Sequence, residues 1–227
     1  MSHPTMINRP SPNFDDRPAN GIIDILLLHY TGMQSAEASL ARLCDPAAKV
    51  SAHYLIDEEG TLFGMVDENK RAWHAGVSHW AGATDINARS IGIELQNPGH
   101  EFGYRPFSEA LMKSLIELCL GILARHPIPP ECVLGHSDVA PLRKEDPGEL
   151  FDWKRLAAAG IGRLPKTVAL DSDPDEQKAR TYLTKIGYDP DAPLADIVTA
   201  FQRRYRQAAV NGTLDRETMS VIRGLAD

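Results

Sequence analysis

Short apolar runs and helical stripes alternate along the first two thirds of the chain. The run IIDILLL at residues 22–28 is almost continuous in apolar side chains, which is typical of a strand buried on both faces. Residues 50–57 alternate between apolar and polar side chains, and after a turn at residues 58–60 the stretch 61–66 fits a hairpin partner. Residues 90–95, SIGIEL, alternate in the same way. The pattern therefore predicts a sheet with a buried strand at its centre.

Helical periods lie between and after these strands. The clearest covers residues 107–125, where apolar side chains recur every three or four positions and Ser108 fits an N-cap. Residues 35–44 fit a second helix, and residues 152–159 fit a short one that Gly160 ends. Strands that alternate with helices favour an α/β fold, which we expect to be a mixed central β-sheet flanked by helices.

The chain divides into four segments by composition. Residues 1–20 are rich in Pro, Asn and Asp and predict an extended N-terminal arm, whereas residues 21–164 hold the strands and helices described above. Residues 165–172 fit a linker. Residues 173–227 contain three short helical patterns, which predict a small C-terminal all-α three-helix domain of about 50 residues, near the lower size limit for independent folding.

Composition narrows the classes of function. Of the 227 residues, 43% are hydrophobic and 24% are charged, as in ordinary globular proteins. The formal net charge of −7 argues against a nucleic-acid partner, because phosphate backbones are bound by basic surfaces. No stretch is apolar and long enough to predict a transmembrane segment, and the N-terminus lacks the apolar core of a secretion signal.

The cysteine pattern favours a reducing compartment. No cysteine forms a C-x-x-C pair and the number of cysteines is odd, so we expect free, buried thiols rather than a disulfide. The three are Cys44, Cys119 and Cys132. Together with the absent signal, this pattern favours the cytoplasm over the periplasm or the cell envelope.

Two histidines and an aspartate end or follow predicted strands. His29 closes the run at residues 22–28, and His136 follows a short apolar strand at residues 133–134. Asp146 comes ten residues later in a polar loop. His29 alone would fit a hydrogen-bonded core histidine equally well. Three such residues from separate elements, however, leave the fourth position of a tetrahedral site open for water, which is the arrangement of a catalytic zinc ion.

Two charged residues could act beside such a metal. Glu94 lies on the strand 90–95 on the same face as Gly92, so its carboxylate would face a cleft, where it could move a proton between water and a leaving amine. Lys144 precedes Asp146 by two residues and could stabilise an oxyanion. A solvated sheet edge and an exposed loop lysine are the ordinary alternatives for Glu94 and Lys144.

The segment His136-Ser137-Asp138 offers a rival site. With His29, its H-x-D pattern would give the two-histidine, one-carboxylate ligand set of non-haem iron oxygenases. Those sites usually occupy all-β jelly-roll barrels, whereas this chain alternates helices with strands. We therefore expect Asp138 to brace the loop after His136 rather than to bind a metal.

Six stretches of the chain resemble the type 2 N-acetylmuramoyl-L-alanine amidases, a zinc-dependent family that includes bacteriophage amidases and the peptidoglycan recognition proteins. They are, in order, LLLHYTG, SAHYLID, RAWHAG, SIGIEL, GHSDVAP and RKEDPGE. The resemblance extends over residues 13 to about 164. It implies the fold of these amidases and recognition proteins, a mixed β-sheet with helices on both faces, and one zinc ion per chain.

By this resemblance the zinc ligands are His29, His136 and Asp146. The catalytic acid/base falls on Glu94, and the lysine that stabilises the oxyanion falls on Lys144. The implied reaction is hydrolysis of the amide between the lactyl group of N-acetylmuramic acid, or of its 1,6-anhydro form, and L-alanine of the stem peptide. Its substrates would be peptidoglycan or soluble muropeptides, including anhydro-muropeptides.

The resemblance also suggests residues that contact the substrate. They are Tyr54, Trp73, His74, Ala75, Asn87 and Arg89. Tyr54 and Trp73 are explained equally well as packed aromatic side chains. His53 points to the face opposite Tyr54 if the segment is a strand, so we expect His53 to be structural.

A non-catalytic recognition protein that binds muropeptides is the alternative function. Recognition-only members of the family typically lack a zinc ligand, whereas this chain keeps all three ligands together with Glu94 and Lys144. The sequence therefore favours an enzyme over a binding protein.

The C-terminal segment resembles in part the three-helix peptidoglycan-binding module. The likeness rests on FQRRY at residues 201–205 and on the turn and helix start at residues 211–218. A packing appendage that stabilises the amidase domain is the alternative. Because every residue with a chemical role lies upstream, we expect a chain cut near residue 172 to keep its zinc and to cleave soluble fragments.

Overall fold

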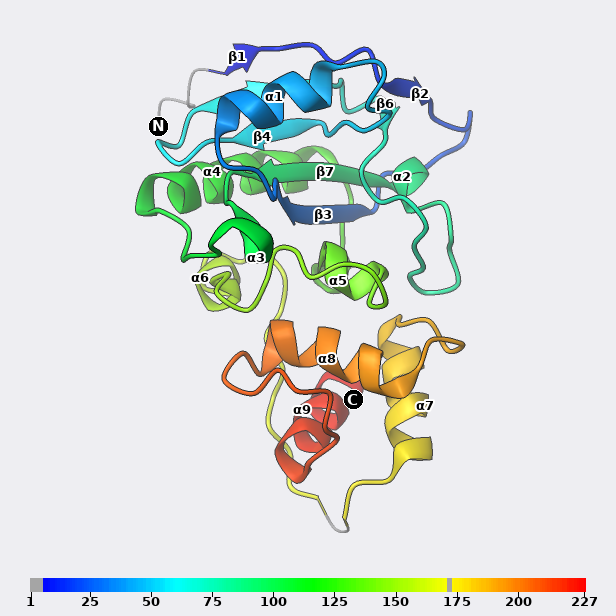
Figure 1. Cartoon of the computed structure of the whole chain (residues 1–227). Helices are drawn as coiled ribbons and strands as arrows, with labels where there is room; N and C mark the ends of the chain where they lie inside the picture. Colours follow the sequence, from blue (N-terminus) through cyan, green and yellow to red (C-terminus); the bar gives the residue numbers. More distant parts are fainter. Residues whose placement is uncertain (1–5, 171–172) are drawn as a thin grey trace.

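The computed structural model describes residues 6–170 and 173–227, and its centre is a mixed β-sheet (Figure 1). Six strands lie in the order β1-β5-β4-β7-β3-β8. The two longest, β3 and β7, pair in parallel in the middle, β4 and β8 flank them in parallel, and β5 runs antiparallel to β4. These strands are β1 (Ile7–Asn8), β3 (Ile25–Tyr30), β4 (Tyr54–Ile56), β5 (Leu62–Gly64), β7 (Ser90–Leu95) and β8 (Val133–Gly135). A small second sheet pairs β2 (Phe14–Asp16) with β6 (Lys70–Ala72).

Helices lie on both sides of the central sheet, which confirms the predicted fold class. We refer to residues 6–164 as the sheet domain and to residues 173–227 as the helical unit. The sheet domain contains α1 (Ala36–Cys44), α2 (Ile86–Arg89), α3 (Gly99–Phe102), α4 (Glu109–Arg125), the 3-10 turn η1 (Pro130–Cys132), α5 (His136–Val139) and α6 (Trp153–Ala158). The helical unit contains α7 (Glu176–Ile186), α8 (Leu194–Tyr205) and α9 (Arg216–Ala226). In Figure 1, α8 is the C-terminal helix that lies next to α5 and the sheet domain.

Apolar side chains close the face of the sheet that α4 covers. Alternate residues of the two central strands point to this face, namely Leu26, Leu28, Ile91, Ile93 and Leu95. They pack against the apolar stripe of α4 and against α6. Helix α4 begins where the sequence predicts, because Ser108 Oγ accepts a hydrogen bond from the backbone N–H of Leu111 at 3.1 Å. This face therefore contributes stability and no chemistry.

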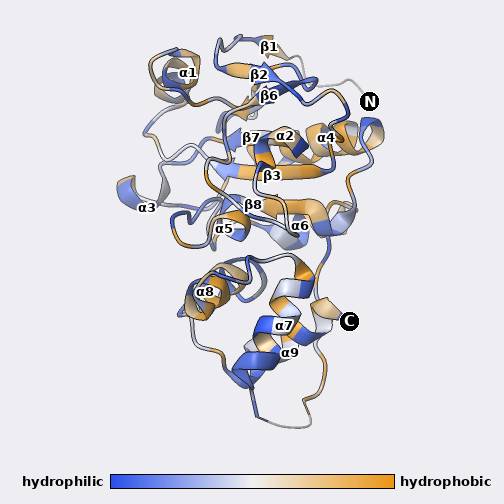
Figure 2. Cartoon of the chain, turned by 90° about the vertical axis from the view of Figure 1, so that its right-hand side faces the viewer, coloured by the Kyte–Doolittle hydropathy of each residue, from blue (hydrophilic) through white to orange (hydrophobic). Residues whose placement is uncertain are grey.

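The opposite face of the sheet is covered in part by the helical unit. Ile25 and Leu27, the other alternate residues of β3, are fully buried in a hydrophobic cluster that includes all three C-terminal helices. These helices contribute, among others, Leu183 of α7, Phe201 of α8 and Ile222 of α9. Figure 2 shows hydrophobic colour along β3 and β8, whereas α7, α8 and α9 carry both colours. The sheet domain and the helical unit thus share one core.

The segment between the two parts lies along α9. The backbone N–H of Val168 donates to Ser220 Oγ at 3.1 Å, and the Ser220 hydroxyl donates to the Val168 carbonyl. Position 224 in α9 requires glycine, because a Cβ there would overlap the carbonyl oxygen of Lys166. Of the predicted linker, residues 171–172 lie outside the described part of the chain.

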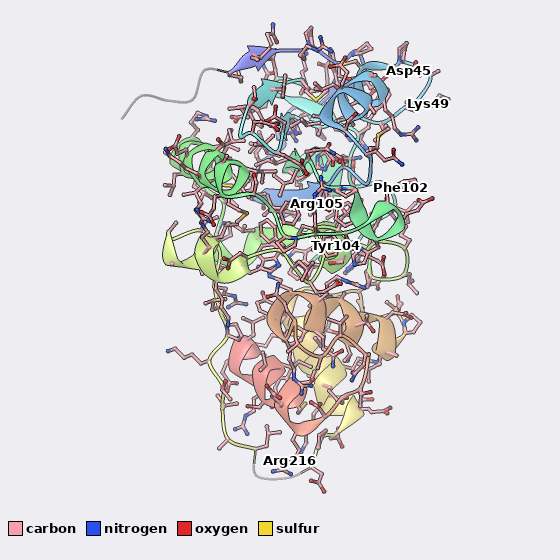
Figure 3. The ribbon with its side chains drawn as sticks, turned by 60° about the vertical axis from the view of Figure 1, so that its left-hand side comes forward. Asp45, Lys49, Phe102, Tyr104, Arg105 and Arg216 are labelled. Atoms are coloured by element: carbon pink, nitrogen blue, oxygen red, sulfur yellow. The ribbon has the colours of Figure 1, made fainter. Side chains whose placement is uncertain are left out.

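The helical unit forms one end of an elongated molecule. Figure 3 shows Arg216, at the start of α9, far from the sheet, and Asp45 and Lys49, beside the end of α1, at the opposite end. Phe102 and Tyr104 lie between these ends, in and just after α3. No helix within residues 6–170 and 173–227 combines the length and the apolar character that a membrane span requires.

The structure corrects two expected element boundaries at the start of the chain. The strand predicted at residues 22–28 begins at Ile25, because β7 begins opposite it, and Ile22 is 62% exposed. The predicted arm at residues 1–20 instead supplies β1 and β2, although residues 1–5 lie outside the described part of the chain. Asn13 anchors this segment, since its side-chain amide donates to backbone carbonyls near α1.

Other expected segments also differ in length. Of residues 50–57, only the last part forms β4, and the short helices α2 and α5 lie directly before β7 and directly after β8. The three cysteines are free, as expected, but only Cys119 is fully buried, whereas Cys44 and Cys132 are half-buried.

Candidate metal centre and its cavity

Three of the predicted residues meet at the carboxyl ends of β3 and β8. His29 lies near the end of β3, His136 begins α5 directly after β8, and Asp146 lies in the loop that follows α5. Because β3 and β8 run in parallel, their carboxyl ends lie at the same edge of the sheet. All three residues are buried, with exposed fractions of 1%, 3% and 6%.

The three side chains turn one polar atom each toward a common point. His29 Nδ1 lies 2.9 Å from His136 Nδ1, and both nitrogens lie 3.0 Å from Asp146 Oδ2. Tetrahedral zinc with bonds of about 2.0–2.1 Å places neighbouring ligand atoms roughly 3.3 Å apart. The triangle of donor atoms therefore fits a metal ion, and these three residues form a cluster that could hold one.

Hydrogen bonds behind the two histidines fix which ring nitrogen faces the cluster. His136 Nε2 donates to the carbonyl of Ala75 at 3.0 Å, which leaves its Nδ1 unprotonated. The Ser90 hydroxyl donates to a backbone carbonyl in α2, so it accepts from His74 Nε2 at 3.4 Å. His74 Nδ1 then accepts from His29 Nε2 at 3.1 Å, and His29 Nδ1 also keeps its lone pair. Both imidazoles are thus held in the form that binds a metal.

Backbone and glycine geometry keep His74 in place. Asn87 Oδ1 accepts hydrogen bonds from the backbone N–H groups of His74 and Ala75, at 3.1 and 2.8 Å. The His74 ring lies directly over Gly92 of β7, where a Cβ would come within 2.5 Å of the ring. The glycine that the sequence places beside Glu94 therefore makes room for a protein side chain, not only for a ligand.

The charges of the cluster match what a metal ligand set requires. Burial acts against the ionised form of Asp146, but the neighbouring His136 and His29 outweigh burial and hold the pKa of Asp146 well below its usual range. Burial, together with the nearby His136, lowers the pKa of His29 to about 4. Neutral imidazole and ionised carboxylate are the forms that coordinate metals.

Glu94 lies beside the cluster on the neighbouring strand. It is paired with His29 in the register of β3 and β7, and it points to the same face of the sheet. Glu94 is 9% exposed, and its Oε2 is buried without a hydrogen-bond partner. Burial and then the charge of Asp146 raise the pKa of Glu94 well above its ordinary value, whereas Lys144 acts to lower it. Such a carboxyl group is suited to taking up and releasing a proton.

A cavity of about 360 Å³ opens over these groups. His29, Glu94, His136, Lys144 and Asp146 all line it, so the structure brings together every residue for which the sequence predicts a chemical role. Helix α1 and the loop before it also line the cavity, through residues that include Met33, Ser39 and Arg42. This volume is of the size of small-molecule sites.

Of the six expected substrate contacts, His74 is the one that lines this cavity. The hydroxyl of Tyr54 instead donates to Glu68 at 2.7 Å, and Trp73 Nε1 donates to Asp15 at 2.7 Å. Arg89 pairs with Asp24 through Nε at 3.0 Å. Each of these three side chains has a partner within the sheet domain and none lines the cavity, and their contact with a substrate stays a prediction. Ala75 and Asn87 act from behind the histidines, as described above.

Two further expectations concern the residues next to these motifs. His53 is structural, as expected: it is fully buried, accepts from the backbone N–H of Gly92 at 2.9 Å, and lies within 3.0 Å of Arg17. Asp138 turns away from His29 and accepts from the backbone N–H of Gly135 at 2.8 Å. The rival iron site is therefore not formed, and Asp138 braces α5.

Sequence reasoning missed the basic residues around the cavity. Arg143 lines it and donates through Nε to the Val77 carbonyl at 2.8 Å and through Nη2 to the Ala75 carbonyl. Its position next to Lys144 was a usable signal. Arg42 comes from α1, which carries none of the conspicuous motifs, so no signal in the sequence indicated it.

Comparison with known proteins identifies the family. A family model described as N-acetylmuramoyl-L-alanine amidase matches residues 19–149. The N-acetylmuramoyl-L-alanine amidase AmiD of Escherichia coli is 36% identical over 231 residues, which cover 90% of this chain and 83% of AmiD. The 1,6-anhydro-N-acetylmuramyl-L-alanine amidase AmpD of Haemophilus influenzae is 36% identical over 167 residues, which cover 66% of this chain and 89% of AmpD.

Solved structures agree with the sequence matches. The complex of E. coli AmiD with anhydro-N-acetylmuramic acid-L-Ala-D-γ-Glu-L-Lys has a TM-score of 0.81 at 34% identity and covers 94% of this chain and 96% of that one. AmpDh3 of Pseudomonas aeruginosa, in complex with an anhydromuramic pentapeptide, has a TM-score of 0.82 at 31% identity and covers 94% and 95%. The chain therefore belongs to the N-acetylmuramoyl-L-alanine amidase family of enzymes.

Proposed function

We propose that this chain is a zinc amidase that hydrolyses the bond between the lactyl group of anhydro-N-acetylmuramic acid and L-alanine in soluble muropeptides. The observation that carries the proposal is the buried triangle of His29, His136 and Asp146 beside the unpartnered carboxyl group of Glu94 in one cavity. The anhydromuramic ligands in the AmiD and AmpDh3 structures support the substrate class.

The three ligands would hold one zinc ion, which would act as a Lewis acid and would lower the pKa of a bound water molecule. Glu94 takes a proton from the attacking water and later delivers it to the amine of L-alanine, so that the leaving group departs neutral. The Lys144 ammonium lies in the same cavity and stabilises the negative charge that develops on the carbonyl oxygen. His74 and Ala75 hold the imidazoles in position throughout.

Replacement of Glu94 by Gln tests this mechanism. The change keeps the size of the side chain and removes its basicity, so turnover of a soluble anhydro-muropeptide should fall by about 10²–10⁴-fold. The zinc content, measured by elemental analysis, should stay near one ion per chain, because Glu94 is not a ligand. Glu101→Gln, an exposed position in α3, is the matched control and should keep full activity.

Two outcomes would redirect the proposal. Near-wild-type turnover in the Glu94→Gln protein would remove Glu94 from the mechanism. Muropeptide binding without turnover in the wild-type protein would favour the recognition protein as its function. An assay with intact sacculi, run in parallel with the soluble substrate, decides whether the substrate is the wall polymer or the fragments released from it. Cytoplasmic location and wall binding by the helical unit remain predictions, to be tested by cell fractionation and by co-sedimentation with sacculi.

A further inference from the structure

A buried ion pair joins the helical unit to the sheet domain. Arg204 of α8 and Asp138 of α5 are 5% and 1% exposed, and Arg204 Nη1 lies 2.7 Å from Asp138 Oδ2. Arg204 Nη2 also donates to the carbonyl of Val133 in β8 at 2.7 Å, and its guanidinium lies over the ring of Trp153, 4.4 Å from the ring centroid. A guanidinium held on three sides fixes the position of what it binds.

Asp138 is also the residue through which the metal-site helix is held. It lies two residues after His136 in α5, and its Oδ2 accepts from the backbone N–H of Gly135, just before His136. Its other oxygen, Oδ1, accepts from the hydroxyl of Tyr188 in the helical unit at 2.8 Å. Two side chains of the helical unit, Arg204 and Tyr188, therefore hold the carboxylate that closes the turn around His136.

Helix α8 also contacts the loop that contains the third predicted ligand, Asp146. Arg203 of α8 lies 3.2 Å from Glu145 and 3.5 Å from Glu149, and these two carboxylates flank the segment that contains Asp146. Glu145 is half-exposed at its side chain, so this contact is weaker than the buried pair. Helix α8 thus touches both segments that deliver ligands after β8.

A buried ion pair is by itself weak evidence for a role in stability. Removing two charges from water costs free energy, and a buried pair is often replaced by apolar residues without loss of stability. An apolar contact at this place would hold the two parts together, but it would not orient the turn at residues 135–138. What the ion pair adds is a fixed geometry for α5.

We propose that Arg204 is a positioning residue for the metal centre, which acts through Asp138 to hold His136 in its metal-binding orientation. The proposal rests on the proposed zinc site. It makes the helical unit a structural part of the amidase site, independent of whether that unit binds cell-wall sugar.

The test uses the full-length chain and zinc alone as the ligand. Zinc affinity is measured by competition with a chromophoric chelator for the wild-type protein, for Arg204→Met and for the double variant Asp138→Asn/Arg204→Met. Asparagine keeps an acceptor for Gly135, and the double variant leaves no unpaired buried charge. Ile222→Val, a fully buried change in α9 within the shared core, is the control for loss of packing.

We expect both Arg204 variants to bind zinc about 10–100-fold more weakly at a temperature where each is folded, as when a partner behind a metal ligand is lost. Ile222→Val should bind zinc as the wild type does. Wild-type affinity in either folded Arg204 variant overturns the proposal. Failure of the wild-type protein to bind zinc would instead overturn the proposed function.

Hydrogen exchange on the wild-type protein tests the proposal without any variant. Because coupling between two sites is reciprocal, removal of zinc should raise amide exchange in α5 and in the end of α8 around Arg204. Exchange in α7 should change less. An α8 that does not respond to zinc removal, even if the Arg204 variants fail to fold, would overturn the proposal.

Discussion

The two faces of the central sheet use the same strands for different purposes. On the α4 face, residues of β3 and β7 such as Leu28 and Ile93 are fully buried among apolar neighbours. On the opposite face, Leu27 packs toward the helical unit, and one alternation further along the strands His29 and Glu94 line the cavity. Adjacent residues of one strand therefore serve packing and chemistry in turn.

The comparison teaches that burial alone does not distinguish the two functions. His29, at 1% exposed, is almost as buried as Leu27 and Leu28, which precede it in β3. The two faces differ in how the elements that cover them are attached to the sheet. The α4 face is covered by an apolar stripe, whereas the other face is covered by a unit that joins it through both apolar packing and the Arg204–Asp138 pair. We expect substitutions on the first face to change stability and those on the second to change the metal site.

Removal of residues 173–227 is the largest test of this difference. The cut would expose a contiguous apolar patch that includes Ile25, Leu27 and Leu134, and it would remove both side chains of the helical unit that hold Asp138. We expect the shortened chain to aggregate or to lose its zinc, contrary to what the position of the chemical residues in the sequence suggested. Size-exclusion chromatography and zinc analysis measure this outcome. A monomeric, zinc-loaded fragment with full turnover would show that the second face does not need its cover.

Leu115→Ala tests the α4 face. Leu115 is fully buried in α4, so its truncation should cost about 2–5 kcal/mol of unfolding free energy, measured by chemical denaturation. Zinc affinity and turnover of the folded protein should not change. Leu120→Ala, at a 46% exposed position of the same helix, is the control and should stay within about 0.5 kcal/mol of the wild type. A change in zinc affinity with Leu115→Ala would show that the faces are coupled.

Substitution of His74 tests the cavity face and has the smallest expected effect of the three. His74→Leu removes the acceptor for His29 Nε2, and we expect zinc affinity to fall by about 10–100-fold with little loss of stability. His74→Asn places an amide oxygen near the former Nδ1 and should restore most of the affinity. Chelator competition compares the two variants. Equal zinc affinity in both would mean that the hydrogen bond to His29 does not hold this ligand.

Much of the site could be predicted because its residues follow strands. The apolar runs that end at His29 and just before His136 indicated strands, and the structure shows that these strands are parallel, so that their carboxyl ends lie together. The alternation in SIGIEL assigned Glu94 to the face opposite Ile93. The hydrophobic periodicity of the strands and the positions of these residues along them were enough to predict this part of the site.

The remainder depends on contacts that local pattern does not contain. Nothing in the helical stripe of residues 194–205 distinguishes Arg204 from a solvated arginine, because its partner Asp138 lies 66 positions away. Tyr54 and Trp73 fit a family motif, yet their partners Glu68 and Asp15 come from segments with no recognisable period. Such long-range polar pairs become visible only when the chain is folded.

A linker that is hydrogen-bonded to one of the parts it connects cannot extend as a flexible linker does. Residues 166–168 lie against Ser220 and Gly224 of α9, so the chain between the two parts has no slack there with which the helical unit could move away from the sheet. Any attachment that the helical unit makes to a polymer would therefore hold the cavity at a set offset and orientation from the anchor point. The enzyme would then cut at a fixed distance from its attachment point, and not anywhere within the reach of a flexible linker.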